Sequence, residues 1–140
     1  MSATMYPWRQ AVVSFLRDHP KIVLAFLFGS AARNRTRANS DIDFAIHLRE
    51  PYSDRDVAAV WDGLEAATHR DVDLIVLNTA PPGIAWTSMK GQVLVDKDPG
   101  VHLELMLQKS REAEDFRDFV TAFLTERRRR WRNRGGPPVA

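Results

Sequence analysis

The sequence predicts an α/β fold in which a small mixed sheet carries helices mainly on one face. Three observations support this prediction. Residues 22–28 form a short apolar run between Pro20 and Gly29, which is typical of a buried strand. Apolar residues at helical spacing occur before this run and again after Ser53. The 140 residues suffice for one domain with a substantial core and not for two ordinary domains.

The first half of the chain contains four predicted elements. Residues 6–18 predict a helix that Pro20 ends, and residues 22–28 and 41–48 predict two strands. Ser53 and Asp56 resemble a capping box with Asp in place of Glu, so a helix is expected from there to about residue 69. A third strand is predicted at residues 72–77.

The second half begins with a chain break at Pro81-Pro82-Gly83, followed by a short helix at 84–90 and a weak strand at 92–95. Asp98 as N-cap and Pro99 at the first helical position open a helix that is predicted to run to about residue 131. Its apolar stripe is expected to contain Leu103, Met106, Phe116, Phe119, Val120, Phe123 and Leu124. The folded domain would span residues 1–131, and the basic, Gly- and Pro-rich tail at 132–140 would be disordered.

Composition excludes several classes of protein. The chain has no cysteine, which excludes disulfides and thiolate zinc sites. No apolar run approaches the length of a membrane span, and the N-terminus lacks the basic-then-apolar order of a signal peptide. A cytoplasmic protein without membrane contacts is therefore expected.

Two carboxylates stand out on the predicted strand 41–48. Asp41 and Asp43 are two residues apart, so their side chains point to the same face of the strand. Neighbouring carboxylates repel each other, and the arrangement is tolerated where the face is wet or where a divalent cation neutralises it. Hard cations such as Mg²⁺ bind carboxylate oxygens together with phosphate oxygens of a nucleotide. We expect this site on the sheet face opposite the helices.

Asp73 on the third strand is a further candidate, and Asp71 has the same parity. Asp73 is preferred because the alternate residues of this strand would then share the core-facing side (Val72, Leu74 and Val76). Three carboxylates suit nucleotidyl transfer with two metal ions. Asp41 and Asp43 could bridge both ions, and Asp73 would bind only the ion beside the nucleophile.

A phosphate cradle is predicted at Gly29-Ser30, directly after the buried strand. Glycine is free to adopt a tight turn, and the serine hydroxyl lies beside backbone N–H groups that can bind an anion. Arg33 could reach a phosphate or pair with a carboxylate at the end of the sheet. Ser40 is expected to cap or orient the turn at Asp41, with nucleotide contact as the alternative.

Gly29-Ser30, ten residues and then Asp41-Ile42-Asp43 together resemble the signature of the DNA polymerase β-type nucleotidyltransferase superfamily. Residues 28–33, 39–44, 72–76 and 77–82 narrow the resemblance to the minimal nucleotidyltransferases, over about residues 22–110. The resemblance implies a polymerase β-like palm, two Mg²⁺ ions and ATP as donor. It implies that Gly29 and Ser30 hold the triphosphate, and that Asp41, Asp43 and Asp73 bind the metals. The family commonly has Gly after the loop arginine, where this chain has Asn34.

Many minimal nucleotidyltransferases are similar to the antitoxins that pair with HEPN-domain ribonuclease toxins. This resemblance implies a HEPN toxin as partner and transfer of AMP from ATP to its tyrosine hydroxyls, which neutralises the toxin. One alternative is a small-molecule hydroxyl as acceptor, as in aminoglycoside nucleotidyltransferases, although these need more chain for an acceptor pocket. The other is a non-catalytic module that covers the toxin, against which the three intact aspartates count.

The C-terminal arginine cluster (residues 127–134) holds six of the twenty Lys and Arg residues. Without it the chain would have fourteen basic and eighteen acidic residues, so the body is mildly acidic. Three interpretations remain open. The cluster could be a solvated helix end favoured by the helix dipole, a contact with an acidic partner surface, or a phosphate contact with nucleic acid that is not sequence-specific.

Overall fold

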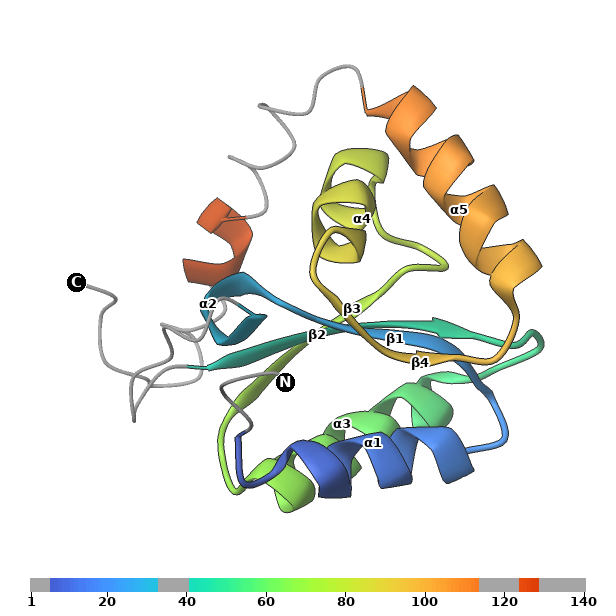
Figure 1. Cartoon of the computed structure of the whole chain (residues 1–140). Helices are drawn as coiled ribbons and strands as arrows, with labels where there is room; N and C mark the ends of the chain where they lie inside the picture. The colour runs from blue at the N-terminus through green and yellow to red at the C-terminus, as the bar shows by residue number, and fades with distance from the viewer. Residues whose placement is uncertain (1–5, 33–40, 114–123, 129–140) are drawn as a thin grey trace.

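The computed structural model describes residues 6–32, 41–113 and 124–128 (Figure 1). Its helices and strands are α1 (Arg9–Asp18), β1 (Ile22–Phe28), α2 (Gly29–Ala32), β2 (Ile42–Leu48), α3 (Asp54–Thr68), β3 (Val72–Val76), α4 (Pro82–Met89), β4 (Gln92–Asp96) and α5 (Pro99–Glu112). Residues 124–128 are also helical. Within these ranges, no helix is both long enough and apolar enough to cross a membrane.

The four strands form one mixed sheet in the order β3-β2-β1-β4, as the predicted fold class requires. β2 and β3 run parallel, and β1 pairs antiparallel with both β2 and β4. The parallel pair is joined by α3, which crosses from the end of β2 to the start of β3. This topology brings the starts of β2 and β3 and the end of β1 together at one end of the sheet.

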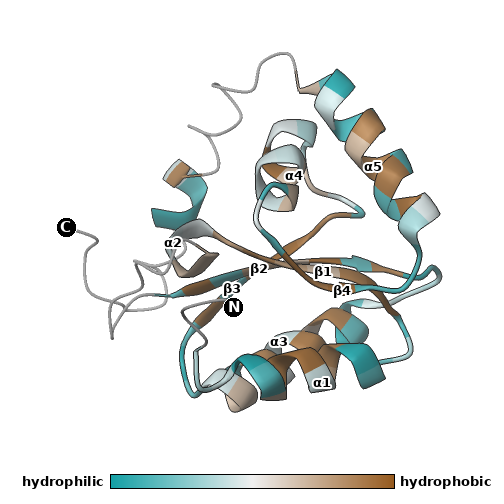
Figure 2. Ribbon diagram, viewed as in Figure 1, coloured by the Kyte–Doolittle hydropathy of each residue, from teal (hydrophilic) through white to brown (hydrophobic). Residues whose placement is uncertain are grey.

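Helices cover both faces of the sheet, so the prediction of helices mainly on one face is wrong. α1 and α3 pack on one face, and α4 and α5 lie on the other (Figure 1). The reason lies in β1, whose seven residues are all buried. A strand that alternates apolar and polar residues needs one covered face, whereas a continuous apolar run needs two. In Figure 2 the hydrophobic strands accordingly lie between two layers of helices.

Helix α5 differs from its prediction. It extends to Glu112, and the predicted continuation to residue 131 falls partly on residues 114–123 and 129–131, outside the described ranges. The predicted stripe was wrong at Leu103, whose side chain is 58% exposed. The residues of α5 that pack against the core are Val101, Leu105 and Met106. Leu124 is also exposed, and the predicted disordered tail at 132–140 lies outside the described residues.

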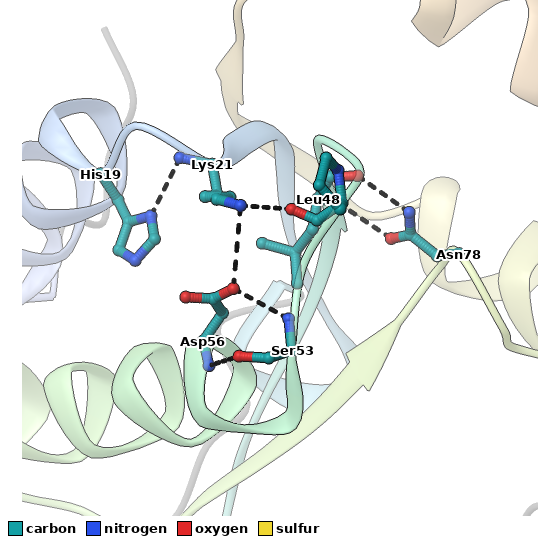
Figure 3. A network of polar contacts seen from close by, with 7 residues as sticks. His19, Lys21, Leu48, Ser53, Asp56 and Asn78 are labelled. Atoms are coloured by element: carbon teal, nitrogen blue, oxygen red, sulfur yellow. Dashed lines mark hydrogen bonds and ion pairs between the residues drawn. The ribbon is translucent and has the colours of Figure 1, made fainter.

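The register of β2 and β3 is extended by a side chain just beyond β3. The backbone N–H of Leu77 donates to the carbonyl of Ile46 at 2.7 Å. The next residue, Asn78, accepts a hydrogen bond from the backbone N–H of Leu48 (2.9 Å) and donates one to its carbonyl (2.8 Å) (Figure 3). The amide of Asn78 therefore satisfies both backbone groups of Leu48 and continues the parallel ladder by two residues.

The predicted capping box at the start of α3 is confirmed. The backbone N–H of Asp56 donates to Ser53 Oγ at 3.2 Å, and the backbone N–H of Ser53 donates to Asp56 Oδ2 at 2.8 Å. Lys21, which directly precedes β1, lies 3.9 Å from the same Asp56 oxygen and also donates to the carbonyl of Pro51 (Figure 3). These contacts tie the start of α3 to the start of β1.

Candidate active site

Asp43 and Asp73 lie directly opposite each other in the parallel register of β2 and β3. Both are buried, with 5% and 8% of their surfaces exposed. Their neighbours along each strand point into the core under α1 and α3, so both carboxylates face the side of the sheet that carries α4 and α5. Asp71 precedes β3 and is exposed. The structure therefore places Asp73, and not Asp71, beside Asp43, and the metal-binding role of Asp73 stays a prediction.

Two side chains of α3 position the start of β3. Trp61 Nε1 donates to the carbonyl of Val72 at 2.8 Å, and Glu65 Oε2 accepts from the backbone N–H of Val72 at 3.0 Å. Both backbone groups of the residue before Asp73 are therefore held by the helix. The sequence analysis missed this role. The available signal was the spacing of four between Trp61 and Glu65, which places them on one helix face.

Gly29 packs against the carboxylate of Asp43. Its φ of +72° lies in the left-handed region, which favours glycine. A Cβ atom at this position would lie 2.2 Å from Asp43 Oδ2. Glycine is therefore required in this turn for two reasons: the left-handed backbone conformation and the close approach of the Asp43 carboxylate. Ser30 follows in α2 and is half-buried.

The edge strand β4 supports the α2 turn through Gln92. Its Nε2 donates to the carbonyl of Ala32 at 2.6 Å, and its Oε1 accepts from Arg9 Nη1 at 3.1 Å. The preceding residue, Gly91, brings the chain so close to β1 that a Cβ atom would lie 2.2 Å from the carbonyl oxygen of Leu27. The C-terminal end of α2 is therefore held by Gln92 of β4, and Gln92 is held in turn by Arg9 of α1.

Arg127 binds both buried carboxylates. Its Nη2 donates to Asp43 Oδ1 and its Nε pairs with Asp73 Oδ2, each at 2.5 Å. The side chain of Arg127 is 24% exposed, so the guanidinium closes the site from the solvent side. In Figure 1 the helical segment 124–128 lies beside α2, at the edge of the sheet where the carboxylates stand. The sequence analysis did not assign this residue to the site.

The electrostatics of Asp43 favour a positive charge at the site. Burial, and to a smaller extent the negative charges of Asp73 and Asp41, raise the pKa of Asp43 to about 7, while the positive charge of Arg127 lowers it. Asp41 is thus close enough to act on Asp43. The ionised form of Asp43 is thus disfavoured by burial and by the neighbouring carboxylates, and it is favoured by a positive charge beside it.

The predicted metal ligands fit a hard cation in part. Asp43 and Asp73 present one oxygen each to a single guanidinium, which marks a position where one cation meets two carboxylates. Within the described ranges, no three Asp, Glu or His side chains converge in a complete metal-binding set. The carboxylate of Asp41 is near enough to raise the pKa of Asp43, and carboxylate oxygens are ligands that Mg²⁺ prefers. Arg33 and Ser40 lie outside the described residues, so their roles stay predictions.

Comparisons with known proteins agree with this arrangement. Residues 10–100 match the model of a family described as polymerase beta, nucleotidyltransferase. A similar protein is the protein adenylyltransferase MntA of Shewanella oneidensis, which is 37% identical over 73 residues. That match covers 49% of this chain and 50% of MntA, so the chain spans about half the length of this curated relative.

Solved structures show the same fold. A chain in a toxin–antitoxin crystal structure with AMP-PNP has a TM-score of 0.67 and 22% identity, over 84% of this chain and 96% of that one. A chain in a complex of tri-AMPylated Shewanella oneidensis HEPN toxin with MNT antitoxin has a TM-score of 0.62 and 20% identity, over 85% and 94% of the two chains.

Proposed function

Because this chain belongs to the polymerase beta nucleotidyltransferase family, we propose that it transfers AMP from ATP to tyrosine hydroxyls of a HEPN-domain ribonuclease toxin and so neutralises the toxin. The observation that carries the proposal is the pair of buried carboxylates, Asp43 and Asp73, which both bind the guanidinium of Arg127. Gly29 packs against Asp43 of this pair. The partner and the acceptor are proposed from two relatives, one named a protein adenylyltransferase and one bound to an AMPylated HEPN toxin.

In this proposal, Asp41, Asp43 and Asp73 hold two Mg²⁺ ions. When bound, the ions neutralise phosphate charge and lower the pKa of the attacking hydroxyl. Gly29 and Ser30 hold the outgoing phosphates, with Arg33 and Ser40 as further contacts. The tyrosine hydroxyl gives up its proton to the solvent as its oxygen forms a bond to the α-phosphorus of ATP. The bond from that phosphorus to the bridging oxygen breaks, and pyrophosphate leaves. Gln92 and Glu65 keep the turn and β3 in place while this occurs.

The burial of Asp43 speaks against a purely non-catalytic cover. Two carboxylates placed side by side in a buried position cost free energy, as the raised pKa of Asp43 indicates. A protein that acts only by covering a toxin has no use for such an arrangement. A cation-dependent reaction at this position accounts for it directly.

The experiment that tests the proposal is transfer of label from α-labelled ATP to the HEPN toxin in the presence of Mg²⁺. EDTA is expected to abolish transfer. Asp43→Asn and Asp73→Asn are each expected to lower the rate by on the order of a thousandfold or more, because metal-ion catalysis supplies much of the acceleration. Asp71→Asn is the matched control, since Asp71 is exposed and is two residues from Asp73. Normal transfer by the Asp43→Asn/Asp73→Asn double variant would refute the site.

A further inference from the structure

The described part of the C-terminal arginine cluster consists of Arg127 and Arg128, and the two side chains have different surroundings. Arg127 is partly buried against the sheet edge, whereas its neighbour Arg128 is exposed. Both carry the same charge on the same short helical segment. This contrast separates a specific contact of Arg127 from the general positive charge of the cluster.

The contact of Arg127 uses the oxygens that a metal ion would need. Its guanidinium bonds Asp43 Oδ1 through Nη2 and Asp73 Oδ2 through Nε. Arginine is suited to this task, because its planar fork can bind two carboxylates at once and its charge is permanent. A divalent cation bound by the same two oxygens would lie next to the guanidinium, and the two positive charges would repel each other.

We propose that Arg127 and the divalent cation compete for Asp43 and Asp73, so that the metal binds only when segment 124–128 withdraws from the site. This proposal rests on the proposed function, because it takes the metal site of nucleotidyl transfer as given. In the metal-free protein Arg127 neutralises two buried carboxylates that otherwise repel each other. Because the arginine is tethered to the same chain, its effective concentration at the site is high, and it raises the metal concentration needed for binding.

The test measures Mn²⁺ binding to the full chain without nucleotide, by electron paramagnetic resonance or calorimetry. Arg127→Ala is expected to bind Mn²⁺ about tenfold to a hundredfold more tightly than the wild type, because the metal no longer has to displace charged hydrogen bonds. Arg128→Ala is the matched control and is expected to stay within about twofold of the wild type, since long-range charge effects are screened. Arg127→Lys is expected to bind Mn²⁺ with an affinity between those of the wild type and Arg127→Ala, because an ammonium group lacks the planar array of donors that bonds two carboxylates.

A second readout follows the segment itself. Trypsin cleavage after Arg127, detected as the fragment that ends there, is expected to be slow in the metal-free wild type and faster when Mn²⁺ is added. In the Asp43→Asn/Asp73→Asn double variant the cleavage should be faster than in the metal-free wild type and independent of metal, because the ion pairs of Arg127 with the two carboxylates are gone. A wild-type cleavage rate that does not change at saturating Mn²⁺ would overturn the proposal.

The outcomes separate this proposal from the proposed function. If the wild type binds Mn²⁺ and Arg127→Ala binds it equally or less tightly, the competition is refuted and the transfer reaction is untouched. If neither protein binds Mn²⁺, the metal site and the competition both fail. AMP transfer by the wild type is measured separately at saturating Mg²⁺, where the metal has displaced Arg127. If the wild type transfers no AMP under those conditions, the proposed function alone is refuted.

Discussion

Asp43 of β2 and Asp73 of β3 are direct partners in a parallel strand pair, although α3 and two loops separate them in the sequence. The pairing depends on contacts at both ends of the strands. Glu65 and Trp61 hold the backbone of Val72 at the start of β3, and Asn78 binds the backbone of Leu48 beyond its end. A shift of β3 by one residue would turn Asp73 toward the core under α1 and α3, away from Asp43.

Replacement of Gly29 by Ala is expected to impair transfer and to destabilise the fold. The left-handed conformation costs a non-glycine residue about 1–2 kcal/mol, and the new Cβ atom would meet Asp43 Oδ2. Transfer should fall by more than this strain alone explains, because Asp43 or the turn has to move. Urea unfolding measures the loss of stability, and initial rates measure the loss of transfer.

Ser30→Ala should slow transfer less than the loss of a metal ligand does, since the backbone amides of the turn remain. Initial rates of transfer measure this difference.

The control for Gly29→Ala is Gly100→Ala. Gly100 lies in α5, where a Cβ atom would lie 3.3 Å from Asp98 Oδ1. Alanine is the better helix former, so the change should be close to neutral in both stability and rate. A Gly29→Ala protein with the stability and activity of Gly100→Ala would refute the packing of Asp43 against the turn.

Asn78→Ala is expected to lower the free energy of unfolding by about 1–3 kcal/mol, because it leaves both backbone groups of Leu48 without their side-chain partner. Denaturant unfolding followed by circular dichroism measures the change. Thr79→Ala is a suitable comparison, since Thr79 is exposed and donates only through its backbone N–H to Val76. Equal stability of the two variants would show that the amide of Asn78 does not help to hold β2 and β3 in register.

The capping box predicts a pH dependence of stability. The hydrogen bond from the backbone N–H of Ser53 holds the pKa of Asp56 below its usual range, and Lys21 acts in the same direction. The folded pKa is below the unfolded one, so the unfolded chain binds the proton more readily. The contribution of Asp56 is therefore complete above the unfolded pKa and is lost as the pH falls through the folded pKa.

Asp56→Asn is the variant that measures this contribution, because its side chain does not titrate. The stability difference between wild type and Asp56→Asn is expected to be constant above the unfolded pKa of aspartate, about 3.9, and to shrink as the pH falls below that value and through the lower folded pKa of Asp56. A difference that stays constant across this range in denaturant titrations would show that the hydrogen bond to Ser53 does not depend on the charge of Asp56.

The elements that the sequence predicted well depend on local signals. The apolar run of β1, the capping box at Ser53 and the Asp98-Pro99 helix start are all readable within a few residues, and each was found. Strand parity placed Asp73 on the face opposite Val72 and Leu74, and in the structure Val72 and Leu74 do point into the core under α1 and α3. The second layer of helices was missed, although the uninterrupted apolar run of β1 required cover on both faces.

The site contacts that the sequence could not predict are long-range. Arg127 meets Asp43 and Asp73 from the far end of the chain, and no local pattern distinguishes it from Arg128 beside it. Helix α5 ends at Glu112, and its predicted continuation to residue 131 lies partly outside the described residues. Gln92 could not be assigned either, since its bonds to Ala32 and Arg9 depend on how β4 joins the sheet.

The intact mass of the toxin shows whether AMP is transferred to it by way of Asp43 and Asp73. The toxin is co-expressed with the wild type or with the Asp43→Asn/Asp73→Asn double variant, purified and weighed by mass spectrometry. We expect a toxin heavier by one or more whole AMP units with the wild type, and an unmodified, toxic protein with the double variant. An unmodified toxin in both cases, with cells protected by both proteins, would contradict this expectation and make this chain a binding module.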